Sequence, residues 1–332
     1  MKILINCPSK FNLESKNISS LGGIESLNIC LAKELSKKKI NITLSTNCHK
    51  TIIKNAIKNV PISKIKKNPE LYNFDTVISS NDASIFNYFK SSKKIFWQHN
   101  ILQVEKAIRK KHFFDIILNN PIGVFVSSYL KNKSSNFFFF KKRMVIPNFL
   151  MFPFIYKKIN YTRKPIFIWS VQRDRGLDKT INMWVNKIYP LNKNAKFYIY
   201  GIKNLPSNYK DKYLASKNII FKGRVSKKEL KNTYNKALAM ICLGYDETFC
   251  LNALEANSCG LPILTFGKTA LKDYVKHKNN GLIVNNYNEL SSSILKILTQ
   301  NSSMRNKFIN NSIAKSNRYN INNIIKYWVK LI

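Results

Sequence analysis

Two glutamates, Glu247 and Glu255, enclose a mostly apolar segment, and Gly260 and Pro262 follow it. This pattern predicts a helix over 248–258, with Glu247 at its N-terminus and Glu255 two turns further along. Backbone N–H groups at a helix N-terminus can bind a phosphate, and the helix dipole favours negative charge there. Carboxylates beside such a site accept hydrogen bonds from hydroxyls. The segment therefore indicates a ligand with phosphate and hydroxyl groups, as in a nucleotide-sugar.

The spacing of the two glutamates argues against a hydrolytic acid–base pair. Eight residues of helix rise about 12 Å, whereas the carboxyl pairs of glycoside hydrolases lie roughly 5 to 9.5 Å apart. We therefore expect Glu247 and Glu255 to contact two different parts of one extended ligand.

Arginines follow two predicted strands of the C-terminal half. Arg173 and Arg175 lie between the strand predicted over 166–170 and the next helix, and Arg224 follows the strand predicted over 218–222. Guanidinium groups at strand ends can bind phosphate oxygens with two hydrogen bonds. In a chain so rich in lysine, either segment could instead be an exposed basic turn. The position between a strand and a helix favours phosphate binding for Arg173 and Arg175, whereas both interpretations stay open for Arg224.

The N-terminal half has two further candidates. Gly22 and Gly23 precede a predicted helix, where glycine lets the backbone approach a ligand closely. Their spacing is not G-x-G-x-x-G, which argues against a nicotinamide enzyme. His99 ends a predicted strand, and it is either a sugar-contacting residue or a structural histidine. The four histidines show no metal-ligand spacing, so we expect no bound metal.

The chain of 332 residues has a formal net charge of +39. Such a surface attracts polyanions, either nucleic acid or an anionic membrane leaflet, although the same composition is typical of AT-rich coding sequence. No basic recognition helix, zinc pattern or stacking motif supports nucleic-acid binding. Four phenylalanines at 137–140 precede three basic residues at 141–143. They form either a lipid-contacting segment or a buried strand with a charged exit.

The remaining composition indicates a cytoplasmic protein. The six cysteines contain no C-x-x-C pair, so we expect reduced thiols. The first apolar run is too short for a signal peptide, and no run of 18 apolar residues predicts a spanning helix. Peripheral attachment to the inner face of the cell membrane stays compatible with these observations.

Strand and helix patterns alternate along the whole chain, which predicts an α/β protein with doubly wound parallel sheets. We expect two Rossmann-like domains, 1–150 and 151–316, and a C-terminal helix within 317–332 that packs back on the first. The strands are expected at 2–7, 40–46, 75–79, 94–99, 123–127, 144–147, 166–170, 196–200, 218–222, 239–243, 262–266 and 282–284. Helices are expected between them, among others at 24–38, 51–58, 83–89, 103–113 and 248–258.

In this order the motifs resemble the group 1, or family 4, glycosyltransferases of the GT-B fold. The strongest similarity is the segment 247–262, with its two glutamates and the following Ala-x-x-x-Gly-x-Pro pattern. The matching segments extend over nearly the whole chain; they are Gly22–Gly23, 97–99, 124–127, 145–148, 175–177, 221–224, 266–267 and 280–284. The resemblance implies two Rossmann-like domains that face a central cleft.

The resemblance also implies a role for each candidate residue. Glu255 would bind the ribose hydroxyls, Glu247 the donor sugar, and His99 the sugar near its reacting carbon. Arg175 stands where the family usually has a lysine that neutralises the leaving group. The diphosphate would be bound by backbone N–H groups of the segment Thr248, Phe249, Cys250 and Leu251, and by Gly22 and Gly23 from the other domain.

Some positions depart from the family pattern. Ser170 aligns with an arginine, so Arg173 or Arg224 is expected to supply that charge, and Cys250 replaces a common glycine. The family retains the anomeric configuration and needs no metal. We accordingly expect a front-side displacement in which the leaving phosphate takes the acceptor's proton.

The acceptor implied is a saccharide or a lipid-linked saccharide, as in the synthesis of cell-surface polysaccharide or lipopolysaccharide. Partners would be the nucleotide-sugar, this acceptor and an anionic membrane surface, without nucleic acid. The alternatives left open are a basic nucleic-acid-binding protein, and an epimerase or hydrolase with the same fold.

Overall fold

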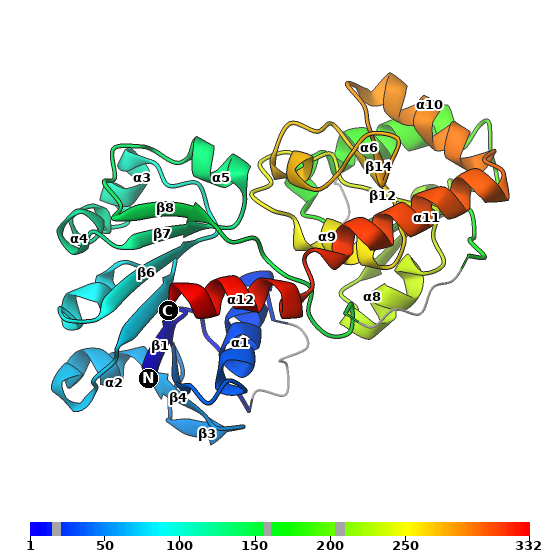
Figure 1. Cartoon of the computed structure of the whole chain (residues 1–332). Helices are drawn as coiled ribbons and strands as arrows, with labels where there is room; N and C mark the ends of the chain where they lie inside the picture. The colour runs from blue at the N-terminus through cyan, green and yellow to red at the C-terminus, as the bar shows by residue number, and fades with distance from the viewer. Residues whose placement is uncertain (15–20, 156–160, 203–209) are drawn as a thin grey trace. The chain divides into compact units, whose positions relative to one another are not determined.

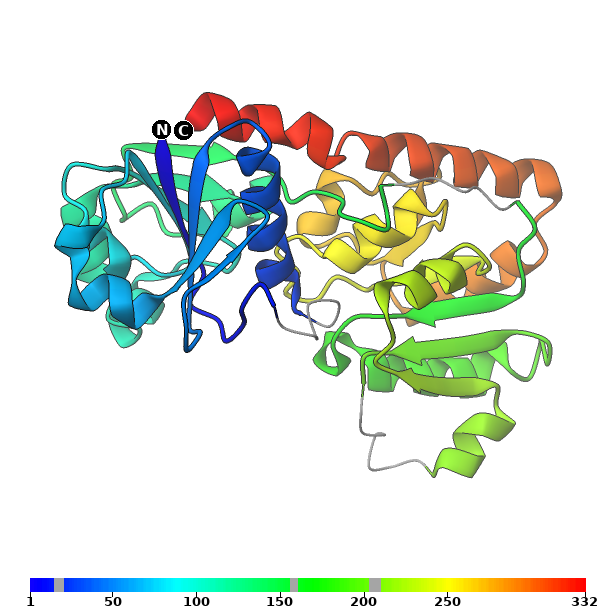
Figure 2. The same ribbon diagram turned by 90° about the horizontal axis from the view of Figure 1, so that it is seen from below.

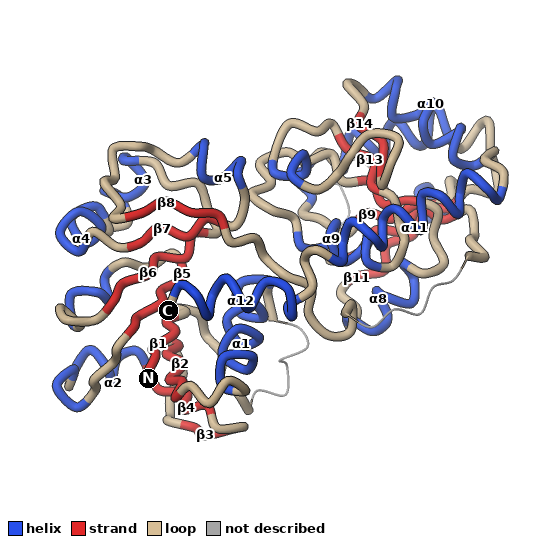
Figure 3. The backbone as a smooth tube through the Cα atoms, viewed as in Figure 1, coloured by secondary structure: helices blue, strands red, loops and turns tan. Residues whose placement is uncertain are grey.

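The computed structural model describes residues 1–14, 21–155, 161–202 and 210–332 of the chain (Figure 1). The chain divides into two compact units, which we call unit 1 (Met1–Met151 with Ile321–Ile332) and unit 2 (Phe152–Asn320). The sequence placed these divisions after residues 150 and 316. Each unit contains its own sheet, drawn as red segments in Figure 3.

Unit 1 contains an eight-stranded sheet in the order β3-β4-β2-β1-β5-β6-β7-β8, in which only the β3–β4 pair is antiparallel. The strands are β1 (Lys2–Asn6), β2 (Asn41–Thr46), β3 (Ile52–Lys54), β4 (Ile57–Pro61), β5 (Thr76–Ser80), β6 (Lys93–Gln98), β7 (Ile122–Phe125) and β8 (Lys142–Val145). Central strands such as β5 and β7 are buried along their whole length, as expected where helices cover both faces of a parallel sheet.

The helices of unit 1 are α1 (Gly23–Ser36), α2 (Ile62–Lys67), α3 (Val104–Arg109), α4 (Phe113–Asn119), α5 (Ser128–Lys133) and α12 (Ile321–Leu331), with 3₁₀ turns η2 (Pro69–Leu71) and η3 (Ser84–Tyr88). Helix α1 buries Leu27, Leu31 and Leu35, which share one face because they are four residues apart. Helix α12 runs beside α1 (Figure 2), and its Trp328 ring lies 4.8 Å from that of Trp97. The C-terminal helix thus completes the core of unit 1.

Three local predictions for unit 1 are wrong. The segment 51–58 is the β3–β4 hairpin and not a helix, because Asn55 and Ala56 both adopt positive φ (52° and 59°), as in a type I′ turn. The helix predicted over 103–113 ends at Arg109, after which Lys111 has φ 56° and α4 begins. The segment 83–89 contains only the 3₁₀ turn η3.

Unit 2 contains six parallel strands in the order β11-β10-β9-β12-β13-β14. They are β9 (Ile166–Trp169), β10 (Lys196–Tyr200), β11 (Ile219–Gly223), β12 (Ala239–Ile241), β13 (Ile263–Thr265) and β14 (Gly281–Ile283). In chain order this is the 3-2-1-4-5-6 arrangement of a doubly wound sheet. The order reverses between β9 and β12, and ligands of such sheets bind at the carboxyl ends of the strands at that point.

The helices of unit 2 are α6 (Leu177–Met183), α7 (Asp211–Ser216), α8 (Lys227–Tyr234), α9 (Leu251–Ser258), α10 (Tyr287–Leu298) and α11 (Ser302–Asn317), with short turns η4 (Arg173–Arg175), η5 (Trp184–Ile188) and η6 (Ala270–Asp273). Side chains of Ser226, Asn286 and Asn301 cap α8, α10 and α11 by accepting backbone N–H groups. No helix in the described parts of either unit combines the length and apolar character that crossing a bilayer requires.

Candidate functional site

The candidate residues of unit 2 gather where the strand order reverses. The connection after β9 contains Arg175, and the connection after β12 contains Glu247 and leads into α9. Because β9 and β12 are neighbouring parallel strands, both connections leave the same edge of the sheet. The sequence predicted Arg175 directly after a strand of this sheet, where ligands of such sheets bind.

Arg175 is the cation at the centre of this edge. Its Nε lies 3.8 Å from Glu247 Oε1, and its Nη1 lies 3.7 Å from Asp246 Oδ2 and donates to the carbonyl of Tyr245. The side chain is only 19% exposed. Its Nε is buried without a hydrogen-bond partner among the described residues. Because buried N–H groups are normally hydrogen-bonded, the Nε–H of Arg175 is available for a further acceptor, which a bound phosphate would provide.

Glu247 is the acid that faces Arg175. Burial raises the pKa of its carboxyl group, and the nearby guanidinium of Arg175 opposes that rise. The side chain keeps 16% of its surface exposed, so a ligand hydroxyl can reach it. The Glu247 carboxylate can therefore pair with Arg175 and also accept a hydrogen bond from a ligand hydroxyl.

Helix α9 begins at Leu251, three residues later than predicted. Cys250 adopts the left-handed conformation (φ 65°) and breaks the helix there. The N–H groups of Leu251 and Asn252 therefore open the first turn and have no partner within the helix. The carbonyl of Cys250 accepts from Tyr274 Oη (3.0 Å), and the amide of Asn252 donates to the carbonyl of Ser170. The N-terminus of α9 is thereby fixed to the connection after β9.

Because α9 starts later than predicted, the distance between Glu247 and Glu255 does not follow from their spacing in the sequence. Since 247–250 are not helical, the rise of a helix does not set the separation of Glu247 and Glu255. Their separate surroundings still distinguish them, because Glu247 contacts Arg175 and Glu255 contacts Lys227.

Lys227 is a functional candidate that the sequence did not reveal. Its ammonium lies 2.7 and 2.6 Å from the two carboxylate oxygens of Glu255, and 3.5 Å from the amide oxygen of Asn252. Burial raises the pKa of Glu255, and the charge of Lys227 opposes this rise. The signal that was available is the capping box at 226–229, where Ser226 Oγ accepts the N–H of Glu229 (3.2 Å). It places Lys227 in the first turn of α8.

The other predicted cations have different surroundings. Arg173 forms two 3.0 Å hydrogen bonds with Asp178 on the surface, so its charge is already paired. Arg224 is exposed directly after β11 and forms no ion pair within the described residues. Ser170 is buried, with its hydroxyl 2.7 Å from that of Tyr234.

The candidates of unit 1 lie at the start of α1 and the end of β6. Gly22 caps α1, and a side chain there would meet Glu25, whose carboxylate lies 2.5 Å from the position of a Cβ; Gly23 is the first helical residue. His99 follows β6, and its backbone N–H donates to Asn81 (2.9 Å). Burial lowers the pKa of His99 to about 3, so its imidazole is neutral at physiological pH.

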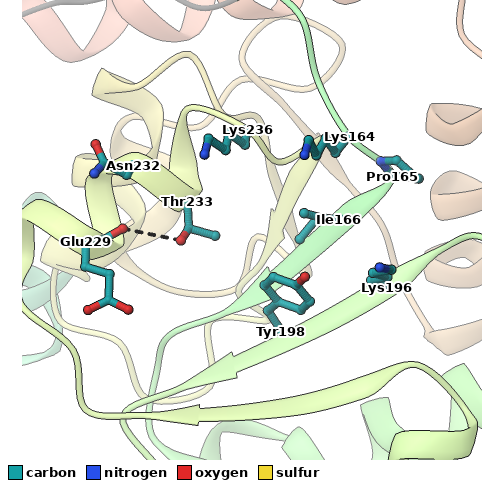
Figure 4. A pocket seen from close by; sticks show the side chains of 9 residues that line it. All are labelled: Lys164, Pro165, Ile166, Lys196, Tyr198, Glu229, Asn232, Thr233 and Lys236. Atoms are coloured by element: carbon teal, nitrogen blue, oxygen red, sulfur yellow. Dashed lines mark hydrogen bonds between the residues drawn. The ribbon is translucent and has the colours of Figure 1, made fainter.

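A cavity of about 510 Å³ lies elsewhere in unit 2 (Figure 4). Its lining comes from the starts of β9 and β10 and from α8, and consists of Lys164, Pro165, Ile166, Lys196, Tyr198, Glu229, Asn232, Thr233 and Lys236. These strand starts are at the opposite edge of the sheet from Arg175 and Glu247. The cavity is therefore separate from the candidate site.

Comparison with known proteins identifies a family model that matches most of unit 2. Residues 156–315 match the family model of the glycosyl transferases group 1. A curated relative from Campylobacter jejuni is the GalNAc-alpha-(1->4)-GalNAc-alpha-(1->3)-diNAcBac-PP-undecaprenol alpha-1,4-N-acetyl-D-galactosaminyltransferase. It is 23% identical over 271 residues, which are 80% of this chain and 64% of the relative. The chain thus matches slightly less than two thirds of that protein.

Solved structures match nearly the whole chain. A glycosyltransferase from Rickettsia africae gives a TM-score of 0.73 at 15% identity, covering 99% of this chain and 97% of its own. HepE from Anabaena, solved with UDP and glucose, gives a TM-score of 0.69 at 13% identity, covering 99% and 98%. The chain therefore has the GT-B fold, and its residues 156–315 are similar to the group 1 glycosyltransferases.

Proposed function

We propose that this protein transfers a sugar from a nucleotide-sugar to the hydroxyl of a saccharide acceptor. The observation that carries the proposal is the convergence of Arg175, Glu247 and the N-terminus of α9 at the β9–β12 edge. Together they offer a cation, hydroxyl acceptors and free N–H groups, which are the partners a sugar diphosphate requires. The family match over 156–315 supports the same reading.

Different residues bind different parts of the nucleotide-sugar donor. Arg175 and the N–H groups of Leu251 and Asn252 bind the diphosphate, and Glu247 accepts a hydroxyl of the sugar. Glu255 accepts the ribose hydroxyls, while Lys227 holds its carboxylate in place. Arg224, which has no ion pair in the part of the chain that the structure describes, adds positive charge near the phosphates.

The reaction follows from where charge develops. The bond between the sugar and the phosphate breaks, and its electron pair passes to the diphosphate. The acceptor oxygen forms the new bond on the same face of the sugar, and its proton passes to the leaving phosphate. Because the new bond forms on the face that the phosphate leaves, we propose that the configuration is retained. Preorganised positive groups stabilise the growing negative charge, so we propose that no metal is needed.

A lipid-linked saccharide is the acceptor we favour. The Campylobacter relative is named for a saccharide carried on undecaprenyl diphosphate. A role in the synthesis of a cell-surface polysaccharide, with the protein attached to the inner face of the membrane, is consistent with such an acceptor and with the net charge of +39.

A donor screen followed by product analysis tests the proposal. Thermal shifts of the full-length protein with a panel of nucleotide-sugars identify the donor, and NMR of the product reports its anomeric configuration. We expect turnover only with a saccharide acceptor, retention, and an unchanged rate in EDTA. Free sugar formed without an acceptor would indicate a hydrolase, and an altered sugar still on the nucleotide would indicate an epimerase. Salt-sensitive DNA binding without any nucleotide binding would favour the nucleic-acid alternative.

A further inference from the structure

Exposed large apolar side chains concentrate in one part of unit 1. Six of the nineteen that the structure describes fall between residues 108 and 139: Ile108, Phe114, Ile117, Leu118, Phe137 and Phe139. Leu118 and Phe139 are 79% and 78% exposed. Single exposed apolar residues are common on soluble proteins, but a cluster marks an interaction surface.

The segment 135–140 shows how the cluster is built. Phe138 is buried, and the ring of Phe140 packs 5.8 Å from that of Phe125. These inward residues alternate with Phe137 and Phe139, which project outward. The four phenylalanines are thus neither a strand nor wholly buried. The inner rings anchor the segment, and the outer rings are half or more exposed, so they can contact a partner.

Helix α4 contributes the second part of the cluster. Phe114, Ile117 and Leu118 are three and four residues apart, so they share the exposed face of this helix. The ring of Phe113 stacks on that of Phe137 at 5.8 Å, which joins α4 to the segment 135–140. We call these exposed residues of α4 and of 135–140 the α4 surface.

Basic residues are frequent in the chain segments that form and flank the α4 surface. The stretch 104–142 contains eight lysines and arginines, which are Lys106, Arg109, Lys110, Lys111, Lys131, Lys133, Lys141 and Lys142. It contains two acids, of which Asp115 already accepts a hydrogen bond from Asn87 (2.7 Å) and Glu105 lies on α3. Helices α3 and α4 are neighbours in Figure 1. The backbone N–H of Lys141 donates to the carbonyl of Pro121 (3.2 Å) just after α4, which places 141–142 near that helix.

We propose that the α4 surface docks the protein on a bilayer that contains anionic lipid. Aromatic and aliphatic side chains would enter the interface while the surrounding lysines and arginines contact the lipid headgroups. A second copy of the chain is a poorer partner, because a symmetric contact would bring two strongly basic rims together. Nucleic acid would use the charge but leave the aliphatic side chains without a role.

The α4 surface lies in unit 1 alone, and its docking on a membrane does not depend on sugar transfer. Only the further step, that the docked membrane also carries the acceptor, rests on the proposed function. The membrane test can therefore fail while donor binding succeeds, or succeed while donor binding fails.

Flotation of the full-length protein with vesicles tests the docking, without any nucleotide present. One set of vesicles is phosphatidylcholine, and the other also contains phosphatidylglycerol. We expect binding to the anionic set alone. Phe114→Ser combined with Phe139→Ser should weaken it about tenfold, because both rings lose their burial in lipid. Lys110→Glu with Lys111→Glu should weaken it at least as much.

Matched controls lie on other exposed parts of the chain. Ile53→Ser with Leu71→Ser removes apolar residues of comparable exposure (72% and 71%), and Lys210→Glu with Lys212→Glu makes the same charge change near α7. Both should bind vesicles as the unaltered protein does. Equal losses in test and control pairs, or no preference for anionic vesicles, would overturn the proposal. A dimer that the phenylalanine substitutions dissociate, or DNA binding that only the charge substitutions reduce, would assign the surface to those partners instead.

Discussion

Arg175 is the residue whose charge the proposed chemistry needs most. It lies in the connection after β9, and its Nε is 3.8 Å from Oε1 of Glu247 in the connection after β12. Replacing it with alanine removes the cation that would stabilise the leaving diphosphate. We expect kcat for glycosyl transfer to fall about 10² to 10³-fold, measured by release of the nucleoside diphosphate.

Arg173 offers a control two residues away. It is paired with Asp178 and is more exposed than Arg175 (40% against 19%). Arg173→Ala should leave kcat within about twofold of the unaltered protein, since an exposed ion pair contributes little. Equal losses in the two variants would show that overall charge, and not the position of Arg175, supports turnover.

Lys227 is predicted to keep Glu255 ionised in its buried place. In Lys227→Met the carboxyl group loses its partner, so burial raises its pKa further above the unfolded value of 4.5. A carboxyl group with a raised folded-state pKa destabilises the native state above that pKa, and the penalty disappears once pH falls below the unfolded value. We expect a loss of about 1–3 kcal/mol at neutral pH, less than for a fully buried pair because Lys227 is 36% exposed.

Urea unfolding at neutral pH and near pH 4 measures this difference. Lys228→Met is the control, because Lys228 follows Lys227 in the same turn of α8 and is exposed. That variant should change the free energy of unfolding little at either pH. A loss for Lys227→Met that persists unchanged near pH 4 would contradict an electrostatic role for the pair.

At the scale of elements, the start of α9 depends on the backbone of Cys250. Its φ of 65° is costly for any side chain, so Cys250→Gly should be more stable than Cys250→Ala by about 1 kcal/mol. At Cys259, which ends the same helix with φ −90°, the order should reverse and alanine should be the more stable. Thermal unfolding of the four variants measures both differences. The same order at both cysteines would mean that backbone conformation does not decide the effect.

The sequence predicted elements best where apolar runs were long and bounded. The strand expected over 196–200 is β10, and that over 166–170 is β9 to within one residue. The β3–β4 hairpin was missed because its turn is Asn55–Ala56, without the glycine that usually marks a type I′ turn. Nor does the pattern indicate that Cys250 delays the start of α9, because left-handed cysteine is uncommon.

The part of the candidate site that lies at strand ends could be predicted from the sequence, but the part that depends on helix packing could not. Arg175 and Glu247 follow neighbouring strands, so their convergence follows from the strand order of a doubly wound sheet. Lys227 lies within a run of charged residues at the start of α8, a pattern typical of an exposed helix. Its pairing with Glu255 depends on how α8 packs against α9, which no local pattern encodes.

At the scale of the whole molecule, the chain returns to unit 1 after completing unit 2. Trp328 of α12 is fully buried beside Trp97, so Trp328→Ala should destabilise unit 1 by about 3–5 kcal/mol. Tyr327→Ala removes a neighbouring side chain that is 50% exposed and should cost under about 0.5 kcal/mol. Hydrogen exchange of strands β1 and β6 reports the stability of unit 1 separately from unit 2. Equal protection in both variants would show that α12 is dispensable for this core.

The proposed function requires that the β9–β12 edge of unit 2 binds a nucleoside diphosphate, with Glu255 accepting hydrogen bonds from its ribose. Titration calorimetry of the full-length protein with the nucleoside diphosphate found in the donor screen, and with its 2′,3′-dideoxy analogue, tests this directly. We expect the unaltered protein to bind the ribose form about tenfold or more tightly than the analogue, since hydrogen bonds to a charged group contribute about 1.5–3 kcal/mol. Glu255→Ala should bind both ligands with equal, weaker affinity. Discrimination that survives in Glu255→Ala would show that Glu255 does not bind the ribose.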